Sequence, residues 1–330
     1  MLKRVDDESE LGLGGRLMRW VGPLVAIGLI AAASYVLWDM VTSMSLFDVT
    51  RAITEMPPWR IAAAFAATAL GMVALAGYDM LAVKVVRSSP PLSLRRAAVT
   101  SLIANIFANA LGLPLLSGGS ARYRIYSLGG AGLSVVGRII AMSWVTMWSG
   151  ILLVLGLSLA LGPPGETPLL GHEAADRALG VVLILLLAGF IGWVGVKRRA
   201  IRLGGWAVRL PGPAIAGGMV AAGAVDLLTA ATALWLLLPE GAAPDLVRYI
   251  VTYTVGLVAG IASNTPGGIG VFEAAVVTGL DVADRPDVAA GLILFRLIYC
   301  IVPLIAAIVL MAVVEWVERR RLARRLGDRI

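Results

Sequence analysis

The stretch LGLPLLSGGSAR, residues 111–122, interrupts a long apolar region with a proline and a glycine pair, and an arginine follows directly. Proline and glycine both weaken a helix. In hydrocarbon, irregular backbone is tolerated only where protein surrounds it or where it lines a water-filled cavity. What this stretch does therefore depends on where the chain places it relative to a bilayer.

The composition indicates a membrane protein. Of 330 residues, 59% are apolar and only 15% are charged, whereas a soluble domain has about 45–50% apolar and about 25% charged residues. We therefore predict an all-α polytopic membrane protein. The net charge of +7 does not indicate a nucleic-acid partner, because the basic residues lie in short blocks between apolar stretches, as the positive-inside rule describes.

Hydropathy and charge together predict the topology. The predicted spans are 20–38, 59–83, 133–161, 178–196, 213–238 and 288–317. Most of the Lys and Arg residues, 22 of 28, fall in segments 1–20, 84–96, 122–138, 197–209 and 318–330. We expect these segments and both termini to be cytoplasmic. The predicted parts are a leader (1–19), one transmembrane domain (20–317) and a basic tail (318–330).

Two further apolar regions, 97–128 and 246–280, are predicted to be re-entrant hairpins. The flanks of the first are both cytoplasmic by charge, so it must return to the side it enters from, and the second must do so from outside. Their breaks are LGLPLLSGGSAR and SNTPGGIGVFE (263–273). Opposed hairpins predict an inverted repeat, with units at about 59–161 and 213–317, an arrangement found in many secondary transporters.

Charged residues embedded in the apolar regions are the candidate site. Each costs roughly 2.5–3.5 kcal/mol at the centre of a span, so such residues are functional candidates by default. Backbone N–H groups at the two breaks, together with Arg122, would suit a phosphate. The alternatives are a structural ion pair between Glu273 and Arg296, an interfacial position for Asp79, and ordinary positive-inside roles for Arg124 and Arg138. The predicted substrate-binding residues are Asp79, Ser117, Gly118, Gly119, Arg122, Arg124, Asp226, Asn264, Gly267, Gly268, Glu273 and Arg296.

The sequence gives little indication of enzymatic, cofactor or metal chemistry. The single histidine, His172, falls in a predicted loop, and the single cysteine, Cys300, lies in an apolar segment. The chain has no Walker motif and no metal-ligand spacing. We therefore expect no enzymatic activity, no cofactor and no metal.

The motifs GYD (77–79), SGGSARYRIY (117–126) and PGGIGVFEA (266–274) carry a family resemblance. With them the chain resembles the lysylphosphatidylglycerol synthase transmembrane-domain family. This family is the flippase half of the bacterial multiple peptide resistance factor, and it also occurs as stand-alone membrane proteins. The resemblance covers nearly the whole chain from about residue 20.

The resemblance implies that the protein moves aminoacylated phosphatidylglycerol from the inner to the outer leaflet of the bacterial cytoplasmic membrane, which confers cationic peptide resistance. Asp79, Arg122, Glu273, Asp226 and Arg296 match the family's functional positions. The resistance factor continues into an aminoacyl-transferase domain, which we do not expect in this chain. A separate lipid-modifying enzyme is therefore an expected partner beside membrane lipids, and a dimer is compatible with the sequence.

Three alternatives remain open at this stage. The chain could transport another lipid, such as a hopanoid or an isoprenoid-linked lipid. It could be a non-catalytic membrane partner that recruits a lipid-modifying enzyme, with the basic tail binding anionic lipid. It could also be an integral-membrane enzyme that acts on lipid headgroups.

Overall fold

The structure, a computed structural model, describes residues 46–86, 88–89, 91–163, 169–196, 200–203, 206–243 and 245–327, and eight positions between 24 and 38. The elements are α2 (Leu46–Glu55), α3 (Pro58–Val85), α4 (Leu94–Leu111), α5 (Ser117–Ser127), α6 (Leu133–Leu161), α7 (Glu173–Val196), β1 (Ala200–Leu203), β2 (Trp206–Arg209), α8 (Pro213–Leu237), α9 (Leu246–Ser263), η2 (Pro266–Gly268), α10 (Val271–Leu280), α11 (Pro286–Phe295), η3 (Arg296–Ile301) and α12 (Val302–Gly327).

The predicted polytopic helical class is confirmed. Six helical segments of the described chain are long and apolar enough to cross a membrane: Pro58–Val85, Leu133–Leu161, Glu173–Val194, Pro213–Leu237, Leu246–Ser263 and Asp287–Arg321. Five of them correspond to predicted spans. The predicted leader (1–19) and first span (20–38) lie outside the described residues apart from the eight positions.

The one segment that matches no predicted span is α9, which belongs to the region predicted as the second hairpin. Its 18 residues give a length of about 27 Å at 1.5 Å per residue, which is close to the thickness of a bilayer core. By length and composition α9 alone therefore qualifies as a span. The re-entrant insertion of this region stays a prediction.

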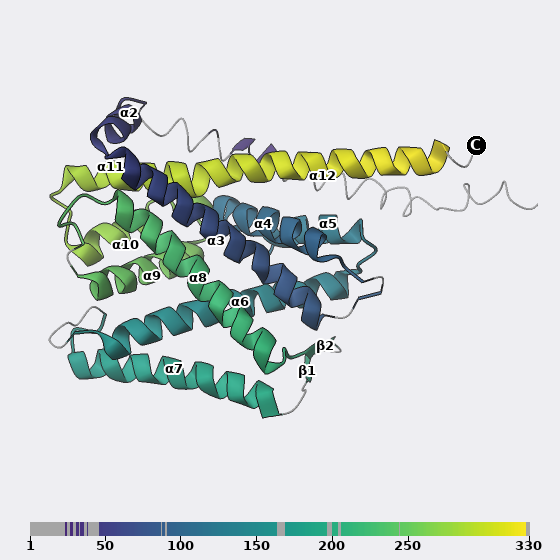
Figure 1. Cartoon of the computed structure of the whole chain (residues 1–330), viewed down its shortest axis with the longest axis horizontal. Coiled ribbons are helices and arrows are strands. Elements are labelled where there is room, and N and C mark those ends of the chain that lie inside the picture. Colours follow the sequence, from purple (N-terminus) through teal and green to yellow (C-terminus); the bar gives the residue numbers. More distant parts are fainter. Residues whose placement is uncertain are drawn as a thin grey trace, which may run out of the picture.

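The regions predicted as hairpins each fold as two helices joined by a break. Helices α4 and α5 pack against each other, as do α9 and α10. In Figure 1, α4–α5 lies toward the right of the molecule and α9–α10 toward the left. The breaks meet, because a Cβ built on Gly112 would lie 2.8 Å from the carbonyl oxygen of Asn264.

Both breaks depend on backbone conformations that glycine adopts most easily. Gly112 has a φ of 67°, and Leu113 after it has a φ of 47°. In the second break, Asn264, Gly267 and Gly268 have φ values of 54°, 62° and 62°. Residues that carry a Cβ rarely adopt a positive φ, whereas glycine does so readily and asparagine more often than most. The glycines and the asparagine therefore explain why the helices end at these points.

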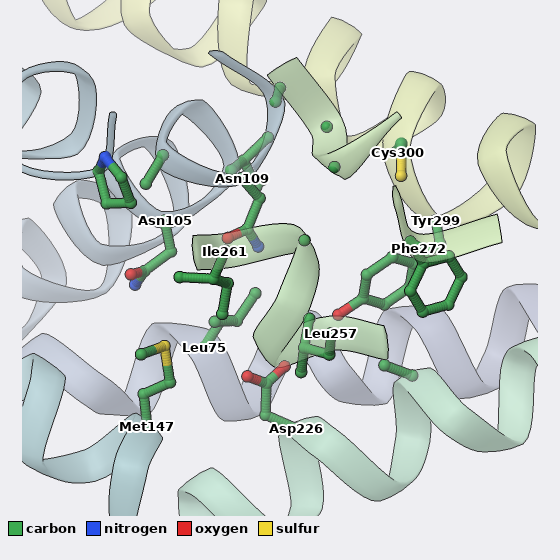
Figure 2. Close-up of a pocket in the computed structure, with 18 of the residues that line it drawn as sticks. Leu75, Asn105, Asn109, Met147, Asp226, Leu257, Ile261, Phe272, Tyr299 and Cys300 are labelled. Atoms are coloured by element: carbon green, nitrogen blue, oxygen red, sulfur yellow. The ribbon is translucent and has the colours of Figure 1, made fainter. Parts of the chain in front are cut away.

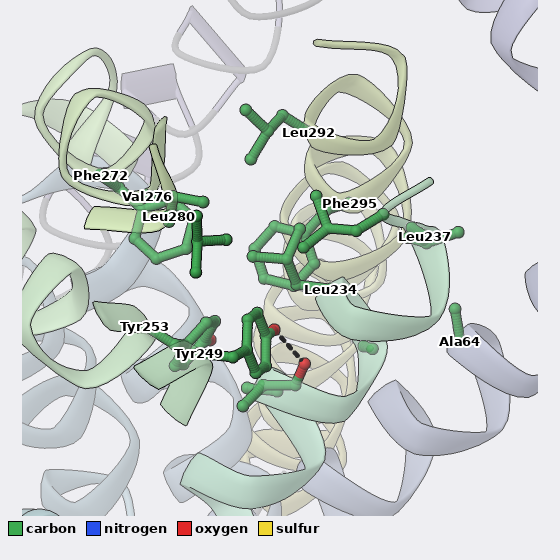
Figure 3. Close-up of a cluster of buried hydrophobic side chains, with 14 of the residues drawn as sticks. Ala64, Leu234, Leu237, Tyr249, Tyr253, Phe272, Val276, Leu280, Leu292 and Phe295 are labelled. Atoms are coloured by element: carbon green, nitrogen blue, oxygen red, sulfur yellow. Dashed lines mark hydrogen bonds between the residues drawn. The ribbon is translucent and has the colours of Figure 1, made fainter. Parts of the chain in front are cut away.

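Close helix packing holds the framework around the breaks. Helix α8 packs against α3 and α6, and α6 also packs against α7 (Figure 1). The largest apolar cluster joins α8 to α9, α10 and α11, with Tyr253 and Phe272 among its side chains (Figure 3). Within it, the Tyr249 hydroxyl donates to the Ala231 carbonyl oxygen at 2.5 Å.

Several of the described parts of the Lys/Arg-rich segments lie on the same side of the molecule. In Figure 1 the end of α3, the β1–β2 pair and the end of α12 all lie toward the right. The antiparallel pair of strands pairs Ala200 with Arg209 and Leu203 with Trp206 in a segment predicted to be a cytoplasmic loop. Helix α12 continues through the predicted basic tail as far as Gly327.

Candidate functional site

Arg122 and Asp79 form a buried ion pair. The Arg122 Nε donates to both Asp79 carboxylate oxygens at 3.1 Å, and its Nη2 donates to Oδ1 at 3.0 Å. The two side chains are 3% and 0% exposed. The Tyr126 hydroxyl donates to Asp79 Oδ2 at 2.9 Å. The pair fixes α5 to α3, because a charge buried without a partner is far more costly than a paired one.

Arg122 Nη2 has two further acceptors within the protein. It donates to Asn105 Oδ1 at 3.0 Å and to Ser143 Oγ at 2.9 Å. The guanidinium that the sequence predicts as a phosphate ligand is therefore engaged by a carboxylate, an amide and a hydroxyl. Its role as a substrate ligand stays a prediction.

At the start of α5, Gly118 packs against α4, Gly119 faces Ile140 of α6, and two of the backbone N–H groups already have acceptors. The N–H of Ser117 donates to the Leu113 carbonyl oxygen at 3.1 Å, and that of Gly119 donates to Pro114 at 3.2 Å. A Cβ on Gly118 would lie 2.7 Å from the Ala104 carbonyl oxygen. The expectation of free N–H groups here is wrong for Ser117 and Gly119, because the tight turn before α5 supplies acceptors.

Arg124, another predicted site residue, binds the last helix. Its Nε and Nη2 donate to the two carboxylate oxygens of Glu315 at 2.6 and 2.8 Å. Nearby, Arg96 Nη2 donates to Glu318 Oε1 at 3.0 Å. These two ion pairs connect the α4–α5 hairpin to α12.

Glu273 and Arg296 form the ion pair that the sequence offered as the structural alternative. The Arg296 Nε donates to Glu273 Oε1 at 2.6 Å, and its Nη2 also contacts that oxygen. Arg296 Nη1 donates to the Gly267 carbonyl oxygen at 3.0 Å. The Gly270 N–H donates to Glu273 Oε2 at 2.9 Å. The ion pair therefore fastens the second break and the start of α10 to the last span.

The two breaks and the helices around them enclose a cavity of about 160 Å³. Figure 2 shows side chains of α4, α8, α9 and the last span converging on it. Its polar lining consists of Tyr78, Asn105, Asn109, Asp226, Tyr253, Asn264, Thr265, Arg296, Tyr299 and Cys300. Arg296, Tyr299 and Cys300 come from η3, a π-helical turn, and such turns are frequent at functional sites.

Asp226 has an incomplete set of hydrogen bonds in this cavity. The Tyr78 hydroxyl donates to its Oδ2 at 2.8 Å. Its Oδ1 is buried and has no hydrogen-bond partner among the described residues. Figure 2 shows the carboxylate directed into the space below Leu257 and Leu75. An unpaired buried acceptor is costly. Among the described lining residues, this oxygen and Arg296 Nη2 are the two buried side-chain atoms without a hydrogen-bond partner.

Aromatic rings form one wall of the cavity. Tyr253 lies edge-on to Phe272, with ring centroids 5.4 Å apart. Phe272 stacks on Phe295 at 5.8 Å, and Phe295 stacks on Tyr299 at 5.1 Å. All four side chains line the cavity, so it has an aromatic wall and a carboxylate.

The structure separates the predicted site residues into two groups. Those that line the cavity are Asp226, Asn264, Gly267, Gly268 and Arg296. Glu273 adjoins it through Arg296. Those that lie in the α3–α5 region and do not line the cavity are Asp79, Ser117, Gly118, Gly119, Arg122 and Arg124. Of these, Arg122 adjoins the cavity through Asn105.

Sequence reasoning missed the asparagines and the aromatic wall. Asn105 and Asn109 stand four residues apart in the otherwise apolar stretch 102–111 of α4, and that spacing places both on one face. This signal could have identified them. The aromatic residues come from α9, α10, α11 and η3, and no local pattern joins them.

The chain has detectable relatives, although no protein-family model matches it. It is 28% identical to the uncharacterized protein slr0712 of Synechocystis sp. over 265 residues, which is 79% of this chain and 81% of that protein. It is 27% identical to the inner membrane protein YbhN of Escherichia coli over 231 residues, which is 68% of this chain and 71% of that protein. These similarities agree with a polytopic membrane protein.

Proposed function

We propose that this protein moves a phospholipid from the inner to the outer leaflet of a bacterial inner membrane. The substrate in this proposal is aminoacylated phosphatidylglycerol or a related anionic or zwitterionic lipid. The observation that carries the proposal is the polar cavity between two broken helices, which holds an unsatisfied carboxylate within an apolar helical framework. The inner-membrane location is extended to this chain from its relative YbhN.

The matching lengths of the helices in the two hairpins support the inverted repeat that this mechanism uses. In the first unit, α4 and α5 have 18 and 11 residues. In the second, α9 and α10 have 18 and 10 residues. In our proposal both hairpins are re-entrant and meet near the bilayer midplane, where transporters built from inverted repeats bind their substrates.

The proposed path carries the headgroup through the protein while the acyl chains stay in lipid. A charged headgroup cannot cross hydrocarbon cheaply, and the cavity offers it asparagine amides, hydroxyls and Asp226 in place of water. The ion pairs of Arg122 and Arg296 hold the two hairpins in position around that path.

Lipid movement in proteoliposomes tests this proposal. We expect the protein to accelerate transbilayer movement of acyl-labelled lysyl-phosphatidylglycerol over that in empty liposomes, measured by dithionite quenching. Asp226→Asn should slow this movement by about tenfold or more, equivalent to about 1.4 kcal/mol in the barrier. Asp284→Asn, at an exposed carboxylate, is the matched control and should retain the rate. A wild-type rate equal to that of empty liposomes would refute the proposal.

A further inference from the structure

We propose that the cavity at Asp226 is a binding site for an organic ammonium group, so that the headgroup enters it with its cation rather than its phosphate. This inference rests on the proposed translocation of lipid and specifies which part of the substrate the cavity recognises. It follows from three observations: the charges in the lining, the aromatic wall and the cavity volume.

The charges favour a cation. Among the described lining residues, Asp226 and Arg296 are the only ones with charged side chains. Arg296 is neutralised by its ion pair with Glu273, and its Nη1 donates to the Gly267 carbonyl oxygen, although its buried Nη2 makes no hydrogen bond. Asp226 forms no ion pair among the described residues, and its buried Oδ1 has no donor. An ammonium group would supply the opposite charge and the donor that this carboxylate lacks, which a phosphate does not.

The aromatic wall favours an organic cation over a metal ion. Tyr253, Phe272, Phe295 and Tyr299 border the same cavity as Asp226. Aromatic faces attract ammonium groups, and desolvated pairs of this kind recur in sites for amine ligands. Hard metal cations instead require about six oxygen ligands. In the described lining Asp226 supplies the only carboxylate, and the other side-chain oxygens are amide and hydroxyl oxygens.

The volume limits what can enter. A cavity of about 160 Å³ is close to the engineered cavity of about 150 Å³ that accommodates benzene. It therefore fits a short aminoacyl or aminoethyl arm but not acyl chains or a sugar. The phosphate and glycerol of a lipid would remain at the mouth of the cavity while its ammonium reaches Asp226.

A matched pair of small probes tests this site. Glycine ethyl ester carries an ammonium group on a short ester arm, and ethyl glycolate replaces it with a hydroxyl of similar size. We would titrate each into the full-length protein in phosphatidylglycerol nanodiscs at about pH 6 and measure binding by calorimetry and by thermal shift. We expect the ammonium ester to bind at least about tenfold more tightly, since hydrogen bonds to charged groups are roughly twice as strong as neutral ones.

Two variants make the result specific to Asp226. Asp226→Asn keeps the shape of the side chain and should remove the preference for the ammonium ester. The exposed Asp284→Asn should keep it. Equal affinity for the two probes in the wild-type protein, or an unchanged preference in Asp226→Asn, would overturn the proposal.

Competition by lipids then identifies the source of the ammonium group. Phosphatidylethanolamine or lysyl-phosphatidylglycerol in the nanodisc should weaken binding of the ester if the ligand is a lipid headgroup. If only soluble amines, and neither lipid, weaken binding of the ester, the site binds a soluble ligand of the same chemistry. Lipid movement without a preference for the ammonium ester would refute this inference and leave the proposed function intact. Binding of the ammonium ester without lipid movement would refute the proposed function and leave the ammonium site intact.

Discussion

Arg122→Ala is expected to unfold this protein at a markedly lower temperature than the wild type. The substitution would leave the Asp79 carboxylate, 0% exposed, with no cation beside it. Breaking a buried ion pair by removing one partner typically costs about 3–5 kcal/mol. Asn105 and Ser143 would also lose the guanidinium donor that binds them. Thermal unfolding in detergent, followed by tryptophan fluorescence, measures the loss.

The control for this experiment is Arg138→Ala. Arg138 is partly exposed and donates to the Ser134 carbonyl oxygen of its own helix, so its loss should change the stability by no more than about 0.5 kcal/mol. The double variant Asp79→Asn/Arg122→Gln removes both charges and should be more stable than Arg122→Ala alone. Wild-type stability in Arg122→Ala would show that the ion pair is not structural.

Gly223→Ala is expected to separate α8 from α6. A Cβ at this position would lie 2.2 Å from the Thr146 carbonyl oxygen and 3.0 Å from the Gly150 Cα. Both are backbone atoms, so neither can move aside unless the helices part. Overpacking of this kind costs about 3 kcal/mol, and we expect a lower unfolding temperature and poor recovery as a monodisperse protein.

Gly217→Ala is the matched control in the same helix. A Cβ there would have no atom within 4 Å, and alanine favours a helix over glycine by about 1 kcal/mol. Gly217→Ala should therefore be as stable as the wild type or slightly more stable. If the two variants unfolded at the same temperature, the close crossing of α6 and α8 would be wrong.

The sequence predicted most of the helices and both breaks. The predicted span 133–161 coincides with α6 (Leu133–Leu161), and 59–83 lies within α3 (Pro58–Val85). Length and hydropathy are sufficient for such segments because a bilayer demands about 20 apolar residues per crossing. The breaks were predictable because glycine and proline mark points where helices end.

The pairing of charges was only partly predictable. The sequence allows an ion pair between Glu273 and Arg296, and they bind each other. It gives no sign of the ion pair between Asp79 and Arg122, which lie 43 positions apart in the chain. That contact depends on how α5 packs back onto α3, which neither hydropathy nor charge counting determines. The cavity was not predicted either, since its aromatic wall forms only when α9, α10, α11 and η3 come together.

In our proposal a lipid headgroup passes through the cavity at Asp226, and photo-crosslinking would locate it there. A phosphatidylethanolamine derivative with a diazirine beside its amine would be activated in proteoliposomes, and the adducts located by mass spectrometry. We expect adducts on cavity residues such as Asn109 and Tyr299, and their loss in Asp226→Asn. Adducts confined to exposed apolar residues of α7, such as Leu185 and Leu186, would show that the headgroup does not enter the cavity.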